Sequence, residues 1–339
     1  MRKMASIQRI AEVASIEGAD AICAYRVNGW WVVDRVGAYQ QGDLAIFCEV
    51  DAWIPHELAP FLSKGKDPRE YNGVKGERLR TVKLRGTLSQ GLLLPLSIRG
   101  EVSEDKAATE DMDVSEELNI QKYEPPVPAQ LAGQVRGNFP TIIPKTDAER
   151  IQNVRDWAAL AATHTFEATE KLHGSSCTFY LDAEGEFHVC SRNMDLKFDE
   201  NNAFWRAAIK YDVESKMRTA ELLGVALQGE LIGAGINGNQ YKVQDIEFRL
   251  FNIYSVNGGT YLTADAREHL NSYALGLPTV PTLDIQVVPN VAEMLKLAEG
   301  KSLLNGSERE GFVLKSLQDP SIIVKVISNK WLLKGGEDQ

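Results

Sequence analysis

Short strand-like runs rich in apolar residues dominate the first third of the chain. They occur at "GWWVVDRVG", "DLAIFCEVDAWI", "LRTVKLRG" and "GLLLPL", and Gly or Asp stands at their ends. Short apolar runs bounded by such residues are typical of β-strands, and Gly and Asp favour the turns between strands. Few stretches of this region have a helical period. The pattern predicts a β-rich unit over residues 1–122, a small barrel or sandwich.

A second region mixes strand-like and helical patterns. Its strand-like runs are "FEATEKL", "CTFYL", "FHVCSR", "VALQGELIG", "EFRLFNIYSV", "REGFVLKS" and "SIIVKVI". Its helical runs are "NNAFWRAAIKY", "ESKMRTAELLG", "AREHLNSYALG" and "VAEMLKLAEG". A further helix is expected over "KTDAERIQNVRDWAALAA", with Thr146 or Asp147 as its N-cap. These patterns predict an antiparallel α+β domain over residues 144–339.

Proline marks the boundary between the two regions. The segment "YEPPVPAQLAG" contains three prolines, which disfavour regular structure. We therefore expect a linker over residues 123–143. The 339 residues are enough for two domains of ordinary size.

Composition adds the class of protein. Hydrophobic residues make up 44% and charged residues 25% of the chain, as in soluble globular proteins. No run approaches the ~20 apolar residues that a transmembrane helix needs, and the first residues show no secretory signal. Four cysteines lie without metal-site spacing. A cytoplasmic protein with no membrane partner is expected.

Charge is segregated along the chain. A net charge of −10 argues against a general nucleic-acid coat, but phosphate contacts depend on where the cations lie. The stretch "GVKGERLRTVKLRG" holds five cations against one acid, Glu77; the cations are Lys75, Arg78, Arg80, Lys83 and Arg85. Four of them, Arg78, Arg80, Lys83 and Arg85, could clamp a duplex backbone or form a merely solvated edge. Trp30 and Trp31 could likewise stack on bases, although core packing of at least one is favoured.

A nucleotide-binding fingerprint elsewhere is misleading. "GAGING" (233–238) satisfies G-x-G-x-x-G, but the sequence after it does not resemble the helix that a dinucleotide site requires. We expect a flexible loop there. No P-loop motif occurs.

Charged residues inside apolar strands carry the strongest functional signal. Lys171 ends one strand-like run within "KLHG", and "SRN" follows about twenty residues later. Glu230 lies within "QGEL", Glu310 begins "EGFVLK", and Lys325 lies within "VKVI". A charge within an apolar strand costs free energy unless it is paired with another charge or takes part in binding or catalysis. Any one of them is explained by an ordinary strand ion pair, but the whole set in this order predicts one shared pocket.

In this set and order the chain resembles the covalent nucleotidyltransferases. KLHG resembles motif I, SRN motif Ia, QGEL motif III, RLFNIY motif IIIa, EGFVLK motif IV and VKVI motif V. With "LRTVKLRGTLSQGLLLPL" and "PKTDAERIQN" added, nearly the whole chain resembles RNA ligases of the Deinococcus and Naegleria type. That resemblance implies an α+β protein: an N-terminal OB-like β-barrel before an antiparallel ligase domain. DNA ligases and capping enzymes carry their OB domain after motif V.

The resemblance also implies the chemistry. A lysine attacks the ATP α-phosphate, AMP passes to a 5′-phosphate, and a 3′-hydroxyl displaces AMP, with Mg²⁺ or Mn²⁺ as the metal. Lys171 would be the nucleophile, Arg192 would contact the ribose, Glu230 the ribose or a metal-bound water, and Phe251 would stack on adenine. Lys315 and Lys325 would contact the α-phosphate, and Arg150 would bind the leaving pyrophosphate. Thr169 and Glu170 would contact the adenine edge. Glu310, Glu230 and His173 would orient the metal through water.

Three positions depart from the relatives' pattern. Many relatives have Asp or Asn in place of His173, some have Asn in place of Ser176, and motif V often has a second lysine in place of Ile327. The expected partner is a nicked RNA duplex or RNA/DNA hybrid, bound by a monomer. Two alternatives stay open: a capping-type guanylyltransferase, and a nucleic-acid-binding protein with an inactive nucleotidyltransferase fold.

Overall fold

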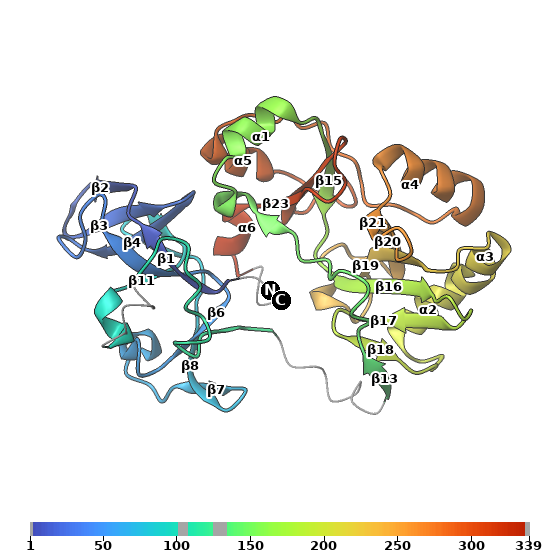
Figure 1. Cartoon of the computed structure of the whole chain (residues 1–339), viewed down its shortest axis with the longest axis horizontal. Coiled ribbons are helices and arrows are strands. Elements are labelled where there is room, and N and C mark those ends of the chain that lie inside the picture. Colours follow the sequence, from blue (N-terminus) through green and yellow to red (C-terminus); the bar gives the residue numbers. More distant parts are fainter. Residues whose placement is uncertain (1–2, 101–107, 125–133, 336–339) are drawn as a thin grey trace. The chain divides into compact units, whose positions relative to one another are not determined.

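Two units divide the chain in the structure, a computed structural model that describes residues 3–100, 108–124 and 134–335 (Figure 1). The N-terminal unit comprises Met1–Pro126 and Gln152–Arg155, and the C-terminal unit comprises Val127–Ile151 and Asp156–Gln339. Residues 125–133 of the predicted linker lie outside the described part, and its later residues include strand β13 (Val135–Asn138).

Strands build the N-terminal unit, as predicted. They are β1 (Ala5–Arg9), β2 (Glu12–Ile16), β3 (Ala19–Val27), β4 (Trp30–Arg35), β5 (Leu44–Cys48), β6 (Ala52–Pro55), β7 (Arg69–Tyr71), β8 (Val74–Arg78), β9 (Val82–Leu84), β10 (Thr87–Ser89), β11 (Leu92–Leu94) and β12 (Gln121–Lys122). Their orders are β1-β5-β11, β2-β3-β4, β12-β6-β8-β7 and β10-β9. Trp30 is fully buried in the core with Tyr25 and Phe47, whereas Trp31 is half-buried. Short 3₁₀ helices, Pro60–Ser63 and Leu96–Arg99, complete the unit.

Two sheets build the C-terminal unit. Their remaining strands are β14 (Glu149–Arg150), β15 (Phe166–Lys171), β16 (Ser175–Leu181), β17 (Phe187–Cys190), β18 (Met194–Leu196), β19 (Val225–Ile232), β20 (Glu247–Ser255), β21 (Thr260–Tyr261), β22 (Gly311–Ser316) and β23 (Ile323–Ile327). The larger sheet has the order β13-β18-β17-β16-β19-β20-β21, and the smaller has the order β14-β23-β22-β15. All pairings are antiparallel except that of β14 with β23. The predicted mixture of helices with mostly antiparallel strands is confirmed.

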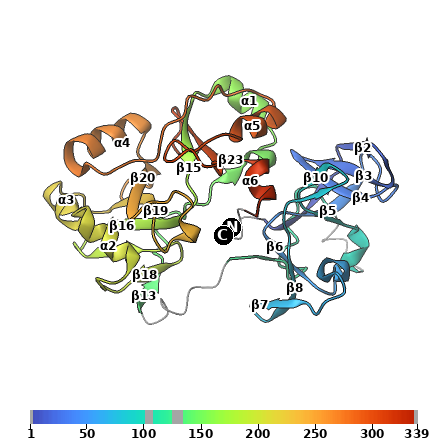
Figure 2. The same ribbon diagram turned by 180° about the vertical axis from the view of Figure 1, so that it is seen from behind.

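Helices cover these sheets. They are α1 (Trp157–Thr163), α2 (Ala203–Lys210), α3 (Val213–Thr219), α4 (Ala264–Leu270) with the π-helical turn Asn271–Leu275, α5 (Val291–Ala298) and α6 (Asn329–Leu333). α1 and α5 lie side by side in both views (Figures 1 and 2). No described helix is long and apolar enough to cross a membrane.

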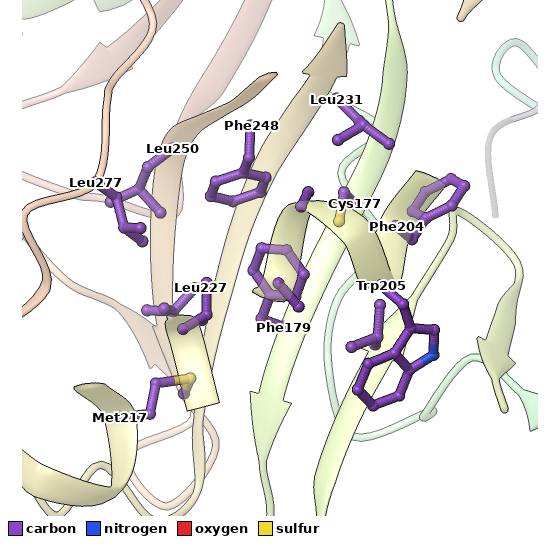
Figure 3. Close-up of a cluster of buried hydrophobic side chains, with 14 of the residues drawn as sticks. Cys177, Phe179, Phe204, Trp205, Met217, Leu227, Leu231, Phe248, Leu250 and Leu277 are labelled. Atoms are coloured by element: carbon purple, nitrogen blue, oxygen red, sulfur yellow. The ribbon is translucent and has the colours of Figure 1, made fainter. Parts of the chain in front are cut away.

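One face of the larger sheet carries the main core of this unit (Figure 3). Phe179 of β16, Leu227 of β19 and Phe248 of β20 point into it, and Trp205 and Met217 enter from α2 and α3. The alternation of the strands therefore turns every second residue to the opposite face, where the polar positions of β16 and β19 lie.

The helix expected over residues 145–162 is largely absent. Glu149 and Arg150 pair with β23 as a short parallel strand, Ile151–Asn153 form a 3₁₀ turn, and α1 begins only at Trp157. Strand pairing with a distant segment overrides the local helical pattern here.

Candidate active site

Lys171 ends β15, opposite Gly311 of the neighbouring strand β22. Alternation along β15 puts Thr169 and Lys171 on one face of the smaller sheet and Glu170 on the other. The Glu170 side chain is buried there and accepts a hydrogen bond from the Leu303 backbone N–H at 2.9 Å. Its side chain therefore does not join Lys171.

Register extends the Lys171 face across the whole smaller sheet. Thr169 lies opposite Val313, and Val313 lies opposite Lys325. Arg150 of β14 is in turn the partner of Lys325. Directly paired residues share a face, so the sheet presents Arg150, Lys325, Thr169 and Lys171 on one side. Of the charged residues expected to share one pocket, Lys171 and Lys325 lie on this face.

The larger sheet contributes the face opposite its core. Ser176 of β16 lies opposite Glu230 of β19. A register shift between Gln228 and Gly229 leaves Phe251 of β20 as an extra residue. Such a bulge re-aims a side chain, and the Phe251 ring packs, partly buried, beside Leu172 rather than in the main core.

Lys171 is held by acids. Its Nζ lies 2.6 Å from Glu310 Oε1. Burial alone would lower the pKa of Lys171, but the carboxylates of Glu310 and Glu230 outweigh it and raise that pKa. Burial, opposed by Lys171, raises the pKa of Glu230 to about 7.

His173 lies beside the same carboxylate. Its Nδ1 is 3.8 Å from Glu310 Oε2, and its backbone N–H donates to the Tyr241 hydroxyl at 2.7 Å. The imidazole packs edge-on against Trp331, with ring centroids 5.1 Å apart. Within the described residues, no group of three or more His, Cys, Asp or Glu side chains forms a metal-ligand set. Glu310, Glu230 and His173 therefore do not make a direct three-ligand site.

Gly311 is required by close backbone approach. Its φ is +153°, and a Cβ built on it would lie 2.1 Å from the Val326 carbonyl oxygen. Any larger residue would push β22 away from β23 at the point where Glu310 meets Lys171. This glycine keeps the ion pair and the sheet in register.

Lys315 occupies a different environment on the same face. It lies opposite Glu167, whose carboxylate pairs with Arg267 of α4 at 2.5 Å. Its ammonium donates to the Phe251 carbonyl and lies 5.7 Å from the Phe251 ring centroid. Burial, with help from Arg267, lowers the pKa of Lys315 to about 7. Glu167 and Arg267 were not expected from the sequence, because neither belongs to a motif.

Arg192 is engaged by an acid from the segment that was expected to be a helix. Its Nη2 lies 2.7 Å from both carboxylate oxygens of Asp147. The neighbouring Thr146 hydroxyl lies 2.9 Å from that of Ser176. The segment before β14 thus borders the Ser176 and Glu230 face, a role that its sequence did not indicate.

Comparison with known proteins agrees with this geometry. An RNA ligase family model matches residues 164–327, which include both sheets' motif residues, and an OB-fold domain model matches residues 4–96. A mutant of Naegleria gruberi RNA ligase solved with AMP and manganese is 38% identical, with a TM-score of 0.89 over 98% of this chain and 99% of that one. The chain belongs to the RNA ligase family.

Other solved forms of the Naegleria gruberi RNA ligase match equally well. A mutant with ATP and manganese gives 38% identity and a TM-score of 0.88 over 98% of this chain and 99% of that one. The form with pyrophosphate gives 38% identity and a TM-score of 0.89 over 99% and 100%. A comparison with curated protein sequences gives no match. The expected OB-fold unit and ligase fold are confirmed for this RNA ligase.

Proposed function

We propose that this protein is an ATP-dependent RNA ligase that joins a 3′-hydroxyl to a 5′-phosphate at nicks in RNA duplexes or RNA/DNA hybrids. The intermediates are a lysyl-AMP on Lys171 and an AMP-capped 5′ end. The observation that carries the proposal is the Lys171–Glu310 pair at 2.6 Å, on a face shared with Lys325 and Arg150. The relatives solved with ATP, AMP or pyrophosphate support it.

Lys171 is the nucleophile of the first step. Its Nζ lone pair attacks the α-phosphorus of ATP, a phosphorus–nitrogen bond forms, and the bond to pyrophosphate breaks. The amine must lose a proton to attack, yet the carboxylates of Glu310 and Glu230 keep it protonated without nucleotide. Drawing these acids away from Lys171 lowers its pKa and frees the lone pair. The ion pair therefore holds the lysine in place until the nucleotide arrives.

A divalent metal fits beside Glu310. Its Oε2 is buried and has no hydrogen-bond partner in the described part of the chain, so an acceptor oxygen is available. Magnesium is commonly held by one or two carboxylates plus substrate phosphates, which agrees with the lack of a three-residue ligand set. Glu310 and Glu230 would hold Mg²⁺ or Mn²⁺, with His173 contacting a bound water. The metal supplies neutralisation of phosphate charge.

We propose different roles for the two motif lysines, in place of the phosphate contact by both that the resemblance implied. Lys325 lies opposite Val313, which lies opposite Thr169, two residues from Lys171. Lys315 lies opposite Glu167, four residues from Lys171 or roughly 13 Å along a strand. We assign Lys325 to the α-phosphate. Lys315, bound to the Phe251 carbonyl, supports the base side of the pocket.

The remaining contacts follow the same geometry. Phe251 stacks on adenine, and Arg150, next to Lys325, receives the leaving pyrophosphate. Arg192 exchanges Asp147 for the ribose. The adenine edge is read by the Thr169 side chain and the backbone of Glu170, because the Glu170 side chain faces the other way.

The test is covalent labelling. The protein, freed of bound AMP, is mixed with ATP or GTP labelled at the α-phosphate, with magnesium or manganese, and resolved on a denaturing gel. We expect an adduct with ATP alone in the wild type, and none with Lys171→Ala. Lys216→Ala is the control, at a partly exposed lysine on α3 that belongs to none of the motifs, and it should label normally. Labelling by GTP alone would indicate a capping-type enzyme, and no adduct from folded protein would indicate a binding protein.

Sealing is then measured on nicked duplexes. Substrates that carry RNA or DNA on either side of the nick separate the contributions of the two strands. Accumulation of the AMP-capped 5′ end is expected when the 3′-hydroxyl is removed. Equal joining of single strands without a template would contradict the preference for nicks.

A further inference from the structure

The hairpin formed by β9 and β10 is an exposed part of the N-terminal unit. β9 pairs only with β10, and all three of its side chains, Val82, Lys83 and Leu84, are exposed. Val82 and Leu84 are 43% and 41% exposed. A two-stranded hairpin is marginal by itself in water, so its position depends on what anchors it.

The base of the hairpin is firmly anchored. The Ser89 hydroxyl accepts a hydrogen bond from the Val33 backbone N–H at 3.0 Å, and the Gln90 backbone N–H donates to the Trp31 carbonyl at 2.8 Å. The buried Gln90 side chain donates to the Thr81 hydroxyl at 3.2 Å. The hairpin is therefore a rigid projection with an exposed tip.

The tip is an arginine in a conformation that disfavours it. Leu84 and Thr87 are paired, so Arg85 and Gly86 form a two-residue loop, with φ of +47° and +84°. Loops of this kind favour Asn-Gly, because both positions need positive φ. Most other non-glycine residues with positive φ in the described chain are indeed Asn or Asp. Backbone strain of this kind is a pointer to function.

Several arginines of the N-terminal unit are neutralised by acids. Arg78, from the same basic stretch, pairs with Asp51 at 2.6 Å. Ion pairs are also formed by Arg9, Arg26, Arg69, Arg99 and Arg155. Lys83 and Arg85 are exposed and form no ion pair within the described residues. In a chain of net charge −10, two cations left open on a rigid tip point to an anionic partner.

We propose that the β9–β10 hairpin binds the phosphate backbone of the duplex that the enzyme seals, through Lys83 and Arg85. This inference rests on the proposed function, because it presumes a nucleic-acid substrate. Phosphate contacts position a protein on a duplex without reading its sequence. A lysine on an exposed edge strand also discourages strand-to-strand association, but that role does not explain an arginine at the strained tip.

Binding is measured with full-length protein and a fluorescent nicked RNA duplex that has a 5′-hydroxyl at the nick, so that no joining occurs. The variant Lys83→Ala with Arg85→Ala should bind about tenfold more weakly at low salt. Its plot of log affinity against log salt should be shallower by about 2, one for each lost contact. The matched control removes two exposed cations elsewhere in the unit, Lys66→Ala with Lys75→Ala, and should change the slope little.

A second variant separates binding from folding. Arg85→Asn supplies the residue that the loop favours, so its melting temperature should equal or exceed that of the wild type. Its salt slope should nevertheless fall by about 1. Unchanged affinity and slope in both hairpin variants would overturn the inference.

The proposed function is checked in the same samples. ATP labelling needs no nucleic acid, so the hairpin variants should label Lys171 like the wild type. Normal labelling with unchanged duplex binding would overturn the hairpin's role alone, whereas a wild type that does not label would remove the ligase function itself. A wild-type dimer that dissociates in the hairpin variants, with duplex affinity unchanged, would assign β9 to contact between copies of the chain and overturn the inference.

Discussion

Lys171 and Lys315 lie on the same face of the same four-stranded sheet, but their surroundings move their pKa values in opposite directions. The carboxylates of Glu310 and Glu230 raise the pKa of Lys171. Burial and Arg267 lower the pKa of Lys315 to about 7. Lys315 also faces an acid, Glu167, but Arg267 already neutralises that acid at 2.5 Å.

The comparison shows that the charge on the neighbours, and not burial by itself, decides the state of each lysine. At the end of β15 the carboxylates of Glu310 and Glu230 outweigh burial and the nearby Arg150, so Lys171 stays protonated. Near the start of β15 the charges are balanced without Lys315, so its ammonium is held mainly by the Phe251 carbonyl. One sheet thus holds a protonated lysine at one end and, at the other, a lysine whose pKa is lowered to about 7.

The largest expected effect comes from Glu310→Gln. This change keeps the size of the side chain but removes the charge, so the pKa of Lys171 should fall. Formation of the covalent adduct should nevertheless slow by at least ~100-fold, because the charge that organises the phosphates is lost. Labelling kinetics measure the rate, and the pH dependence of Lys171 acetylation, read by mass spectrometry, measures the pKa. Faster adduct formation in this variant than in the wild type would contradict this role, and would mean that Glu310 only keeps Lys171 protonated.

Lys315→Met should act on stability as well as on ATP use. The pKa of Lys315 is about 7 in the folded protein and about 10.5 in an unfolded chain. Between these two pH values, Lys315 is less protonated in the native state than in the unfolded state. The free energy of unfolding therefore gains from this group as pH rises through that window. The variant should lose this gain, and its KM for ATP should rise about tenfold if Lys315 supports the base. Urea unfolding at pH 7, 8.5 and 9.5 measures the first effect.

Lys171→Met is the matched control for that experiment. Because its folded pKa is raised, Lys171 contributes stability that is present below the unfolded pKa and is lost as pH rises through the folded pKa. Removing it should change the pH profile in the opposite sense to Lys315→Met. Identical profiles for the two variants would contradict the comparison.

Arg267→Met should make the surroundings of Lys315 resemble those of Lys171. Without Arg267, Glu167 is left beside Lys315 with its charge uncompensated, so the pKa of Lys315 should rise. Loss of a partly buried pair should cost about 1–3 kcal/mol in the free energy of unfolding. The gain in stability above pH 7 should become smaller than in the wild type. The same urea series detects this, with the exposed pair variant Arg218→Met on α3 as control.

The sequence was sufficient for the strands that carry the candidate site. Strand-like patterns located β15, β22 and β23. One lysine in each strand marked the face that they share: Lys171 at the end of β15, Lys315 within β22 and Lys325 within β23. This prediction of a shared face succeeded because a strand has only two faces. A charge in an apolar run is costly unless it is paired, so the charged side chains gather on the face where they are paired or bind a ligand.

Other features depended on contacts between distant segments. The pairing of Arg150 with Lys325 turned an expected helix into a strand. The ion pairs Asp147–Arg192 and Glu167–Arg267 join residues 45 and 100 positions apart. The bulge that frees Phe251 depends on register. Local patterns contain no information on register or on such distant pairs, so these features could be seen only in three dimensions.

The smallest expected effect concerns His173, which stands where Asp or Asn was expected from the resemblance. Its Nδ1 lies 3.8 Å from Glu310, and a neutral imidazole brings no negative charge to the Lys171 end of the sheet. His173→Asp should lower, a few-fold, the metal concentration that gives half-maximal adduct formation, because hard cations prefer carboxylate oxygens. His173→Asn, similar in size to Asp but neutral, should not. Equal metal requirements for the two variants would show that charge at this position does not control metal binding, and that packing against Trp331 is what the histidine provides.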